Sequence, residues 1–259
     1  MKLYGQYIQP EAFSIRVDHK AAGGERFRRN RLVRPRQPLT HFIDSLPAEA
    51  FEDRGGFLVG LKSKGLLFRY NAGPGRLGFL ICPSCGFARP MKGVKAKTGQ
   101  KHEKLRVRAG EDRLCNCDTP LKSIALGHSF NSFCLILRPK GLIRSVESLA
   151  FALHRGICGA TEVEPSDIGV SWRYLADRSS GSTEIILFDL TPGGSGFCEA
   201  GRNAWERVLE EGLKVVETCK CEKACYDCLK SYANQPFHDR LDHVAAVRDL
   251  KALMTLKAK

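Results

Sequence analysis

The chain has 259 residues, of which 43% are hydrophobic and 27% charged, a composition typical of one large or two ordinary globular domains. Its 41 Lys and Arg residues outnumber 28 Asp and Glu residues, and the formal net charge of +13 favours a polyanionic partner such as nucleic acid. No apolar run approaches the about 18 residues of a membrane span, and the start, MKLYGQYIQPEAF, lacks a signal-peptide pattern. We therefore expect a cytoplasmic protein without membrane contact, where clustered cysteines bind metal.

Residues 1–75 are expected to form a β-rich, basic N-terminal region. Short strand-like pieces (FSIRV, GGFLVGL and GLLFRYN) alternate with basic and Gly/Pro-rich connections, and none has a long helical period. The string RFRRNRLVRPRQP concentrates arginines beside the single nearby acid Glu25. From this run we predict DNA phosphate contacts by Arg28, Arg29 and Arg31, with a solvated basic loop as the alternative.

Residues 76–125 are expected to form a zinc-ribbon-like insertion. The string Cys82-Pro-Ser-Cys85-Gly is a zinc-knuckle turn, because the glycine tolerates positive φ and lets backbone N–H groups approach the sulfurs. A second cysteine pair follows about thirty residues later, across a basic loop. This arrangement predicts a zinc ion on four thiolates: Cys82, Cys85, Cys115 and Cys117. His102 or Asp118 is an alternative ligand, and free thiols are the alternative to a metal site.

The loop between these cysteine pairs carries a second basic run. It contains few apolar residues, which predicts a mobile, positively charged finger. We expect DNA contacts from five of its side chains: Lys95, Lys97, Lys101, Lys104 and Arg106.

Residues 126–259 have the pattern of a mixed α+β domain. A strand is expected over LKSIALGHSFNSFCLILRP, a helix over VESLAFALHRGICGATEV, and a hairpin over DIGVSWRYL and STEIILFDL. A long amphipathic helix containing Trp205 and Val216 follows, and a last helix is expected at about 240–255. The predicted fold class is therefore α+β: a mixed sheet with C-terminal helices, a zinc-ribbon insertion and a four-cysteine knuckle near the C-terminus.

The string Thr191-Pro-Gly-Gly-Ser-Gly lies between the last strand and the long helix. A strand, glycine loop and helix in this order can bind an anion, although a tight turn packed on the sheet is the alternative. The loop is not a nucleotide P-loop, since no G-x-x-x-x-G-K-[ST] string occurs in the chain. Three isolated cysteines in apolar surroundings are expected to be core residues: Cys134, Cys158 and Cys198.

Four cysteines within TCKCEKACYDCLKSYANQ give the strongest chemical signal. In C-x-C the side chains share one side of an extended backbone, and in C-x-x-C a tight turn brings the thiols together. Four convergent thiolates make a closed tetrahedral zinc site, here on Cys219, Cys221, Cys225 and Cys228. Neighbouring lysines favour the thiolate form. Disulfides and an iron–sulfur cluster are the alternatives, and with the ribbon we expect two zinc ions in all.

The strings ILFDLTPGGSGFCEAG and CKCEKACYDCLKSYANQPFH, separated by a helix, resemble the MrfA-like zinc-binding domain family over roughly Ser145 to Leu250. This domain lies at the C-terminus of certain superfamily-two DNA helicases and occurs in DrmB of the DISARM anti-phage system. The resemblance implies that the four C-terminal cysteines are the family's zinc ligands.

The chain departs from those helicases because it has no Walker A lysine and no D-E-x-H string. The resemblance therefore implies a non-enzymatic DNA-binding accessory module in anti-phage defence or DNA repair, whose helicase/ATPase subunit is encoded separately, or the C-terminal piece of a split helicase. Two alternatives remain: a protein–protein assembly module without DNA contact, and a metal-dependent nuclease. Candidate acids and bases for a nuclease are Glu147, Glu184, Asp189, His128, His154 and His238.

Overall fold

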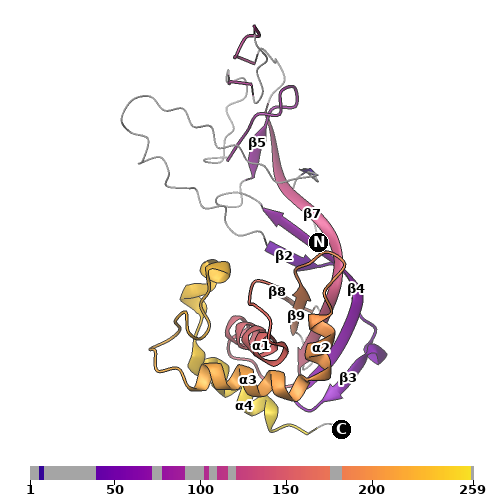
Figure 1. Cartoon of the computed structure of the whole chain (residues 1–259), viewed down its shortest axis with the longest axis vertical. Coiled ribbons are helices and arrows are strands. Elements are labelled where there is room, and N and C mark those ends of the chain that lie inside the picture. The colour runs from indigo at the N-terminus through magenta and orange to yellow at the C-terminus, as the bar shows by residue number, and fades with distance from the viewer. Residues whose placement is uncertain are drawn as a thin grey trace. The chain divides into compact units, whose positions relative to one another are not determined.

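The computed structural model forms two compact units, one of residues Met1–Leu39 and Arg69–His128 and the other of Thr40–Phe68 and Ser129–Lys259. It describes residues 6–8, 39–71, 78–90, 102–104, 110–115, 121–175 and 183–257. Two long strands, β4 (Phe57–Asn71) and β7 (Lys122–Pro139), contribute residues to both units (Figure 1). The units are called unit 1 and unit 2 below, in the order given.

The sheet of unit 2 is built around the second half of β7. On one side β7 pairs antiparallel with β9 (Thr183–Asp189), which pairs antiparallel with β8 (Ile168–Tyr174). On the other side lies β4, flanked by β2 (Leu39–Phe42) and paired with β3 (Phe51–Arg54). The predicted β8–β9 hairpin is thus confirmed. The separately predicted GGFLVGL and GLLFRYN strands form the single strand β4.

Strand β9 explains how the core of unit 2 is divided. All seven of its residues are buried, and successive side chains of a strand point to opposite faces. Ile185 and Leu187 therefore join the large cluster under the helices, whereas Ile186 and Phe188 join a smaller cluster with Phe42 and others. A strand that is buried on both faces is nearly continuous in apolar residues, as this one is.

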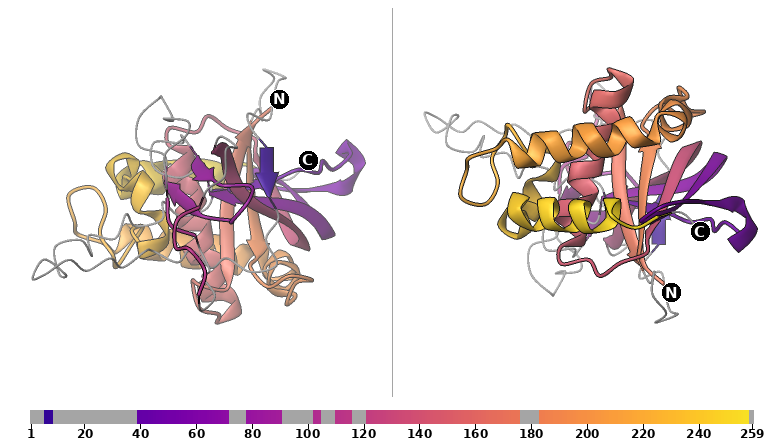
Figure 2. Two further views of the ribbon diagram at one scale, coloured as in Figure 1. Left: turned by 90° about the horizontal axis from the view of Figure 1, so that it is seen from above. Right: turned by 90° about the horizontal axis from the view of Figure 1, so that it is seen from below.

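The helices of unit 2 cover one face of its sheet. Helix α1 (Val146–Thr161) packs on β8 and β9 and is covered in turn by α3 (Trp205–Glu217) and α4 (His243–Met254), which lie side by side in the right-hand view of Figure 2. The long amphipathic helix expected to contain Trp205 and Val216 is confirmed as α3, and a short helix that the sequence did not predict precedes it. α2 (Phe197–Asn203) ends at Ala204, whose φ of −103° and ψ of 34° break the helical path before α3.

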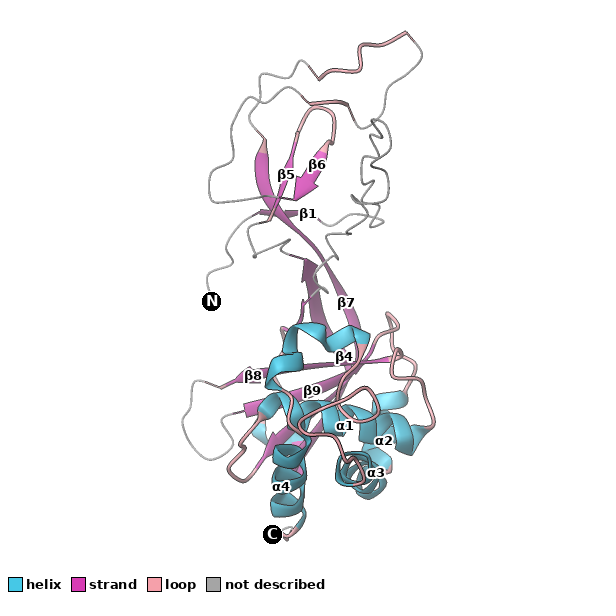
Figure 3. Ribbon diagram, turned by 90° about the vertical axis from the view of Figure 1, so that its left-hand side faces the viewer, coloured by secondary structure: helices cyan, strands magenta, loops and turns pink. Residues whose placement is uncertain are grey.

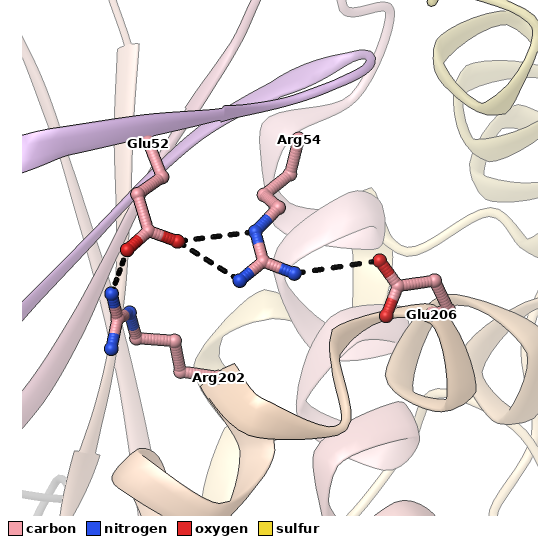
Figure 4. Close-up of polar contacts among 4 residues, drawn as sticks. All are labelled: Glu52, Arg54, Arg202 and Glu206. Atoms are coloured by element: carbon pink, nitrogen blue, oxygen red, sulfur yellow. Dashed lines mark hydrogen bonds and ion pairs between the residues drawn. The ribbon is translucent and has the colours of Figure 1, made fainter. Parts of the chain in front are cut away.

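An ion-pair network joins the β3–β4 hairpin to these helices (Figure 4). Glu52 on β3 accepts hydrogen bonds from Arg54 and from Arg202 on α2, and Arg54 lies 3.6 Å from Glu206 on α3. The side chains keep exposures of 30–72%, so each pair contributes little to stability, although together they fix how the hairpin lies on α2 and α3.

Unit 1 contains short strands around the first half of β7. β1 (Gln6–Ile8) pairs with β7 in parallel, β5 (Phe79–Ile81) pairs with it antiparallel, and β6 (Ala88–Pro90) pairs with β5. The parallel pair makes the sheet mixed, as predicted. Every helix longer than one 3₁₀ turn in the described chain belongs to unit 2 (Figure 3). A membrane-crossing helix is likewise missing from the part of the chain that the structure describes.

Candidate metal centres

The four-cysteine loop of unit 2 lies between the end of α3 and the 3₁₀ segment η3 (Tyr232–Arg240). The Sγ atom of Cys219 is 3.3 Å from that of Cys221 and 3.4 Å from that of Cys225, and Cys228 Sγ is 3.7–3.8 Å from those of Cys225 and Cys221. Zinc–sulfur bonds of about 2.3 Å place the sulfurs of a tetrahedral site about 3.8 Å apart. Disulfide sulfurs are only about 2.0 Å apart. The spacing therefore fits a single zinc ion and not disulfides.

Backbone N–H groups of the loop point at its sulfurs. The Cys225 N–H donates to Cys228 Sγ at 3.2 Å. The Cys221 N–H donates to the sulfur of Cys219, which lowers the pKa of the Cys219 thiol to about 7. Burial acts in the opposite direction on Cys221 and Cys228 and raises the pKa of both thiols. A bound cation would reverse that effect, because zinc is bound by thiolates rather than thiols.

Two side chains that sequence reasoning missed hold this loop from outside. Arg155 on α1 donates to the carbonyl oxygens of Cys228, Tyr226 and Lys230 at 2.9–3.2 Å. His243, the first residue of α4, places its ring nitrogens 2.9 Å from Val216 O and 2.8 Å from Cys221 O. The loop is therefore tied to α1, α3 and α4 at once. A charged residue next to His154 in the largely apolar middle of α1 was the available signal for Arg155.

A second group of metal-ligating side chains lies in unit 1. The ligand atoms of its four residues all lie within 4.8 Å of one another: Cys82, Cys85, His102 and Cys115. Three of the four predicted ribbon cysteines are thus together. Cys117, the fourth predicted ligand, lies outside the described residues. Within the described chain, this group and the four-cysteine loop are the two places where three or more such residues converge.

Of the predicted DNA-contacting residues, the structure describes Lys104. Its side chain is 28% exposed and its Nζ lies 3.9 Å from Glu111. The others lie outside the described residues: Arg28, Arg29, Arg31, Lys95, Lys97, Lys101 and Arg106.

The candidate acids of a nuclease have structural partners. Glu184 is fully buried and its two oxygens lie 2.7 Å from Arg138 Nη2 and 2.6 Å from Arg173 Nη2. Glu147 accepts from Arg240 at 3.1 Å. The two guanidinium groups compensate the charge of the buried Glu184 carboxylate, which accounts for its place in the strand.

The candidate histidines are also engaged in local structure. His154 donates its Nε2–H to the Ile168 carbonyl at 2.9 Å, and burial lowers the pKa of its ring. His238 Nε2 lies 3.0 Å from the Ser231 carbonyl and 3.0 Å from Asn234 Oδ1. Burial and the positive charge of Arg69 lower the pKa of His128.

The carboxylate of Asp189 occupies the position at which the glycine loop was considered able to bind an anion. Its Oδ2 accepts from the N–H groups of Ser195 and Gly196 at 2.7 Å each and of Phe197 at 3.2 Å, and its Oδ1 accepts from Cys198 N–H at 3.0 Å. The N-terminus of α2 is thus neutralised by the chain's own buried carboxylate. The tight-turn alternative is correct for this loop.

The isolated cysteines are core residues, as expected. Burial raises the pKa of Cys134 and of Cys158 to about 12 and that of Cys198 well above its ordinary value. Thiols in such surroundings are poor nucleophiles and poor ligands.

Comparison with known proteins first defines the class of the C-terminal part. Residues 149–229 match the family model described as "MrfA Zn-binding domain". The matched segment includes Arg155 and all four cysteines of the loop. This segment matches the MrfA type of zinc-binding domain, and the resemblance stated from the sequence is confirmed over the matched residues.

Among curated proteins, the chain is 24% identical over 188 residues to Druantia protein DruE of Escherichia coli (strain UMEA 4076-1). The alignment covers 65% of this chain and 10% of DruE. Among solved structures, similar chains are the DUF1998 helicase MrfA bound to DNA (14% identity, TM-score 0.47) and bound to DNA and AMPPNP (13% identity, TM-score 0.37). The two alignments cover 84% and 82% of this chain, respectively. They cover 24% and 23% of the two MrfA chains.

Proposed function

We propose that this chain is a non-catalytic, zinc-stabilised DNA-binding module of a cytoplasmic helicase-type complex that acts in anti-phage defence or DNA repair. The match of residues 149–229 to the MrfA Zn-binding domain model carries the proposal. The similarity to DruE and the net charge of +13 support it.

The zinc of the four-cysteine loop has a structural role in this proposal. Four thiolates leave no open coordination position for water or substrate, and metal binding contributes directly to the folding free energy of such a loop. Arg155 and His243 join the loop to α1, α3 and α4. The zinc-bound loop therefore holds the three helices in fixed positions relative to one another. The module then offers a rigid body to which a motor subunit and DNA can bind.

The helicase/ATPase subunit is proposed to be encoded separately. A pull-down with the helicase encoded next to this chain, repeated after nuclease treatment, tests direct contact. Binding that survives the nuclease supports a protein partner, whereas binding that disappears indicates tethering through DNA. An adjacent helicase and methyltransferase would favour a DISARM-type defence role over repair.

The DNA contacts can be tested by charge neutralisation. Replacing Lys95, Lys97 and Lys101 by glutamine should weaken binding alike for all DNA sequences, because phosphate contacts carry no sequence information. The slope of log K against log salt concentration should fall by about 0.7–0.9 for each lysine–phosphate interaction that the variant removes. Fluorescence anisotropy of a labelled oligonucleotide, titrated at several salt concentrations, measures both effects.

A matched control neutralises the same number of lysines elsewhere. Lys214, Lys251 and Lys257 are exposed in the C-terminal helical part of unit 2. Their triple glutamine variant should keep the parent's affinity and salt slope. If both triple variants lose the same affinity, only net charge matters, and the assignment of the DNA contacts to the 91–113 loop is wrong.

A further inference from the structure

The metal group of unit 1 has a histidine where the ribbon pattern suggests a fourth cysteine. We infer that Cys82, Cys85, His102 and Cys115 bind one zinc ion as a three-cysteine, one-histidine site, with His102 Nε2 as the fourth ligand in place of Cys117.

The spacing of the ligand atoms fits a tetrahedral zinc ion. Cys82 Sγ lies 3.9 Å from Cys115 Sγ, and Cys85 Sγ lies 3.3 Å from His102 Nε2. Zinc–sulfur bonds of about 2.3 Å and zinc–nitrogen bonds of about 2.0 Å require about 3.8 Å between sulfurs and about 3.6 Å between sulfur and nitrogen. Hydrophobic packing alone does not require four donor atoms from three segments to meet at this spacing.

The first two ligands are presented by a knuckle turn. Directly after β5, the Cys82 N–H donates to the Phe87 carbonyl at 2.8 Å, and the Gly86 N–H donates to the Cys82 carbonyl at 2.9 Å. Gly86 has φ of 73°, which a residue with a side chain rarely adopts. The CPxCG sequence therefore forms the turn it predicts, with both sulfurs on one side.

The other two ligands are presented by a short antiparallel pairing. Glu103 and Leu114 form a β-bridge, and the Cys115 N–H donates to the His102 carbonyl at 2.9 Å. His102 and Cys115 are thus directly opposite each other, which places their side chains on the same face of the pair. This register selects His102 among the polar residues of the loop.

The imidazole ring of His102 is also oriented by the knuckle. It stacks on the ring of Phe87 with centroids 4.7 Å apart and planes 24° from parallel. Phe87 follows the second knuckle cysteine by two residues, so the same turn supplies two sulfurs and the surface that directs Nε2 toward Cys85. The aromatic ring thus positions the ligand without binding the metal.

The buried residues around this group, within the described part of unit 1, favour a role for metal in folding. Its buried cluster in the described chain comprises Leu80, Cys82, Cys115 and Leu121, of which two are proposed ligands. A core of this size supplies little folding free energy, and small domains compensate with metal ions or disulfides. Three thiolates and an imidazole are a common set for a closed structural zinc site.

The experiment counts zinc in the purified 259-residue chain after dialysis to remove loosely bound metal. The parent should hold two zinc ions per chain, and His102→Ala should hold one. Cys117→Ala should hold two, and His102→Cys, which restores a thiolate ligand, should also hold two. Two zinc ions in His102→Ala, or one in Cys117→Ala, overturns the assignment.

A second measurement covers the case in which His102→Ala loses zinc only because unit 1 unfolds. In a long-range ¹H–¹⁵N spectrum of the parent, zinc should hold the His102 ring in one tautomer, with Nδ1 protonated and Nε2 coordinated. A His102 ring whose nitrogen signals stay the same after a strong chelator removes all zinc is not a ligand. Neither measurement depends on DNA binding, so failure of the proposed function leaves this inference testable.

Discussion

At the scale of single residues, Asp189 is a buried polar group that ties the glycine loop to the end of β9. It is fully buried, and it is the acceptor for four consecutive backbone N–H groups at the start of α2. Asp189→Asn keeps the shape but replaces one acceptor oxygen by a donor that faces other donors. Because bonds to a charged acceptor contribute about 1.5–3 kcal/mol and an unmatched buried donor costs a similar amount, we expect a loss of about 2–4 kcal/mol in unfolding free energy.

Urea unfolding followed by circular dichroism measures this loss. Asp239→Asn makes the same chemical change at an exposed position of η3 and should shift the unfolding free energy by less than about 0.5 kcal/mol. Equal stability of the two variants would show that the four hydrogen bonds to Asp189 do not hold the loop.

Single residues also mark where sequence reasoning reaches its limit. The four C-terminal cysteines could be predicted because all ligands lie within ten residues, so the turn itself brings them together. Arg155 and His243 could not, since they bind backbone carbonyls that lie more than twenty residues away and leave no mark on the pattern. His102 was identified as an alternative ligand, but it is the structure that favours it, through its register with Cys115 and its distance from Cys85.

At the scale of elements, two glycines set the distance between α1 and α3. A Cβ on Gly156 would lie 2.1 Å from the Val208 carbonyl oxygen and 3.0 Å from the Gly212 nitrogen, and a Cβ on Gly212 would lie 2.9 Å from the Ala152 oxygen. Glycine costs a helix about 1 kcal/mol relative to alanine, so its presence here reflects close backbone approach. Gly156→Ala should therefore destabilise unit 2 by about 1–3 kcal/mol despite its better helix propensity.

Gly159→Ala is the matched control on the same helix. The nearest atom to its Cβ would be the Glu211 Cβ at 3.2 Å, a contact that a shift of a few tenths of an ångström relieves, whereas the 2.1 Å contact of Gly156 is with backbone. We expect Gly159→Ala to be neutral or slightly stabilising in the same urea titration. A Gly156→Ala protein as stable as Gly159→Ala would mean that the helices can separate without cost.

Elements whose apolar residues recur with a clear strand or helix period were predicted well. Strands β7, β8 and β9 and helices α1 and α4 follow their apolar patterns, because each packs a defined face on the core. Helix α3 also follows its predicted stripe from Trp205 to Val216, whereas the short helix α2 before it was missed because few of its residues are buried. The sheet order was not accessible either: β7 lies between β4 and β5, which are consecutive in the chain.

At the scale of the whole molecule, the two metal groups stabilise units with very different cores. The four-cysteine loop packs against the large cluster that α1, α3 and α4 share, whereas the group of unit 1 provides two of the four members of the buried cluster in the described part of that unit. Burial of apolar area dominates folding free energy, so the larger apolar cluster among the described residues favours greater metal-independent stability of unit 2. Removal of zinc should consequently unfold unit 1 and only loosen unit 2 locally.

Hydrogen exchange with mass spectrometry, before and after a strong chelator, tests this expectation. Peptides from 79–90 and 102–115 should lose most of their protection, and those from 218–231 should lose it locally, because zinc binding is part of the folding free energy of both loops. Peptides from β9 and α1 should keep their protection, since their residues are buried among apolar side chains. Added zinc should restore the original pattern. Equal loss of protection in β9, α1 and the cysteine loops would show that the metal holds the core of unit 2 itself.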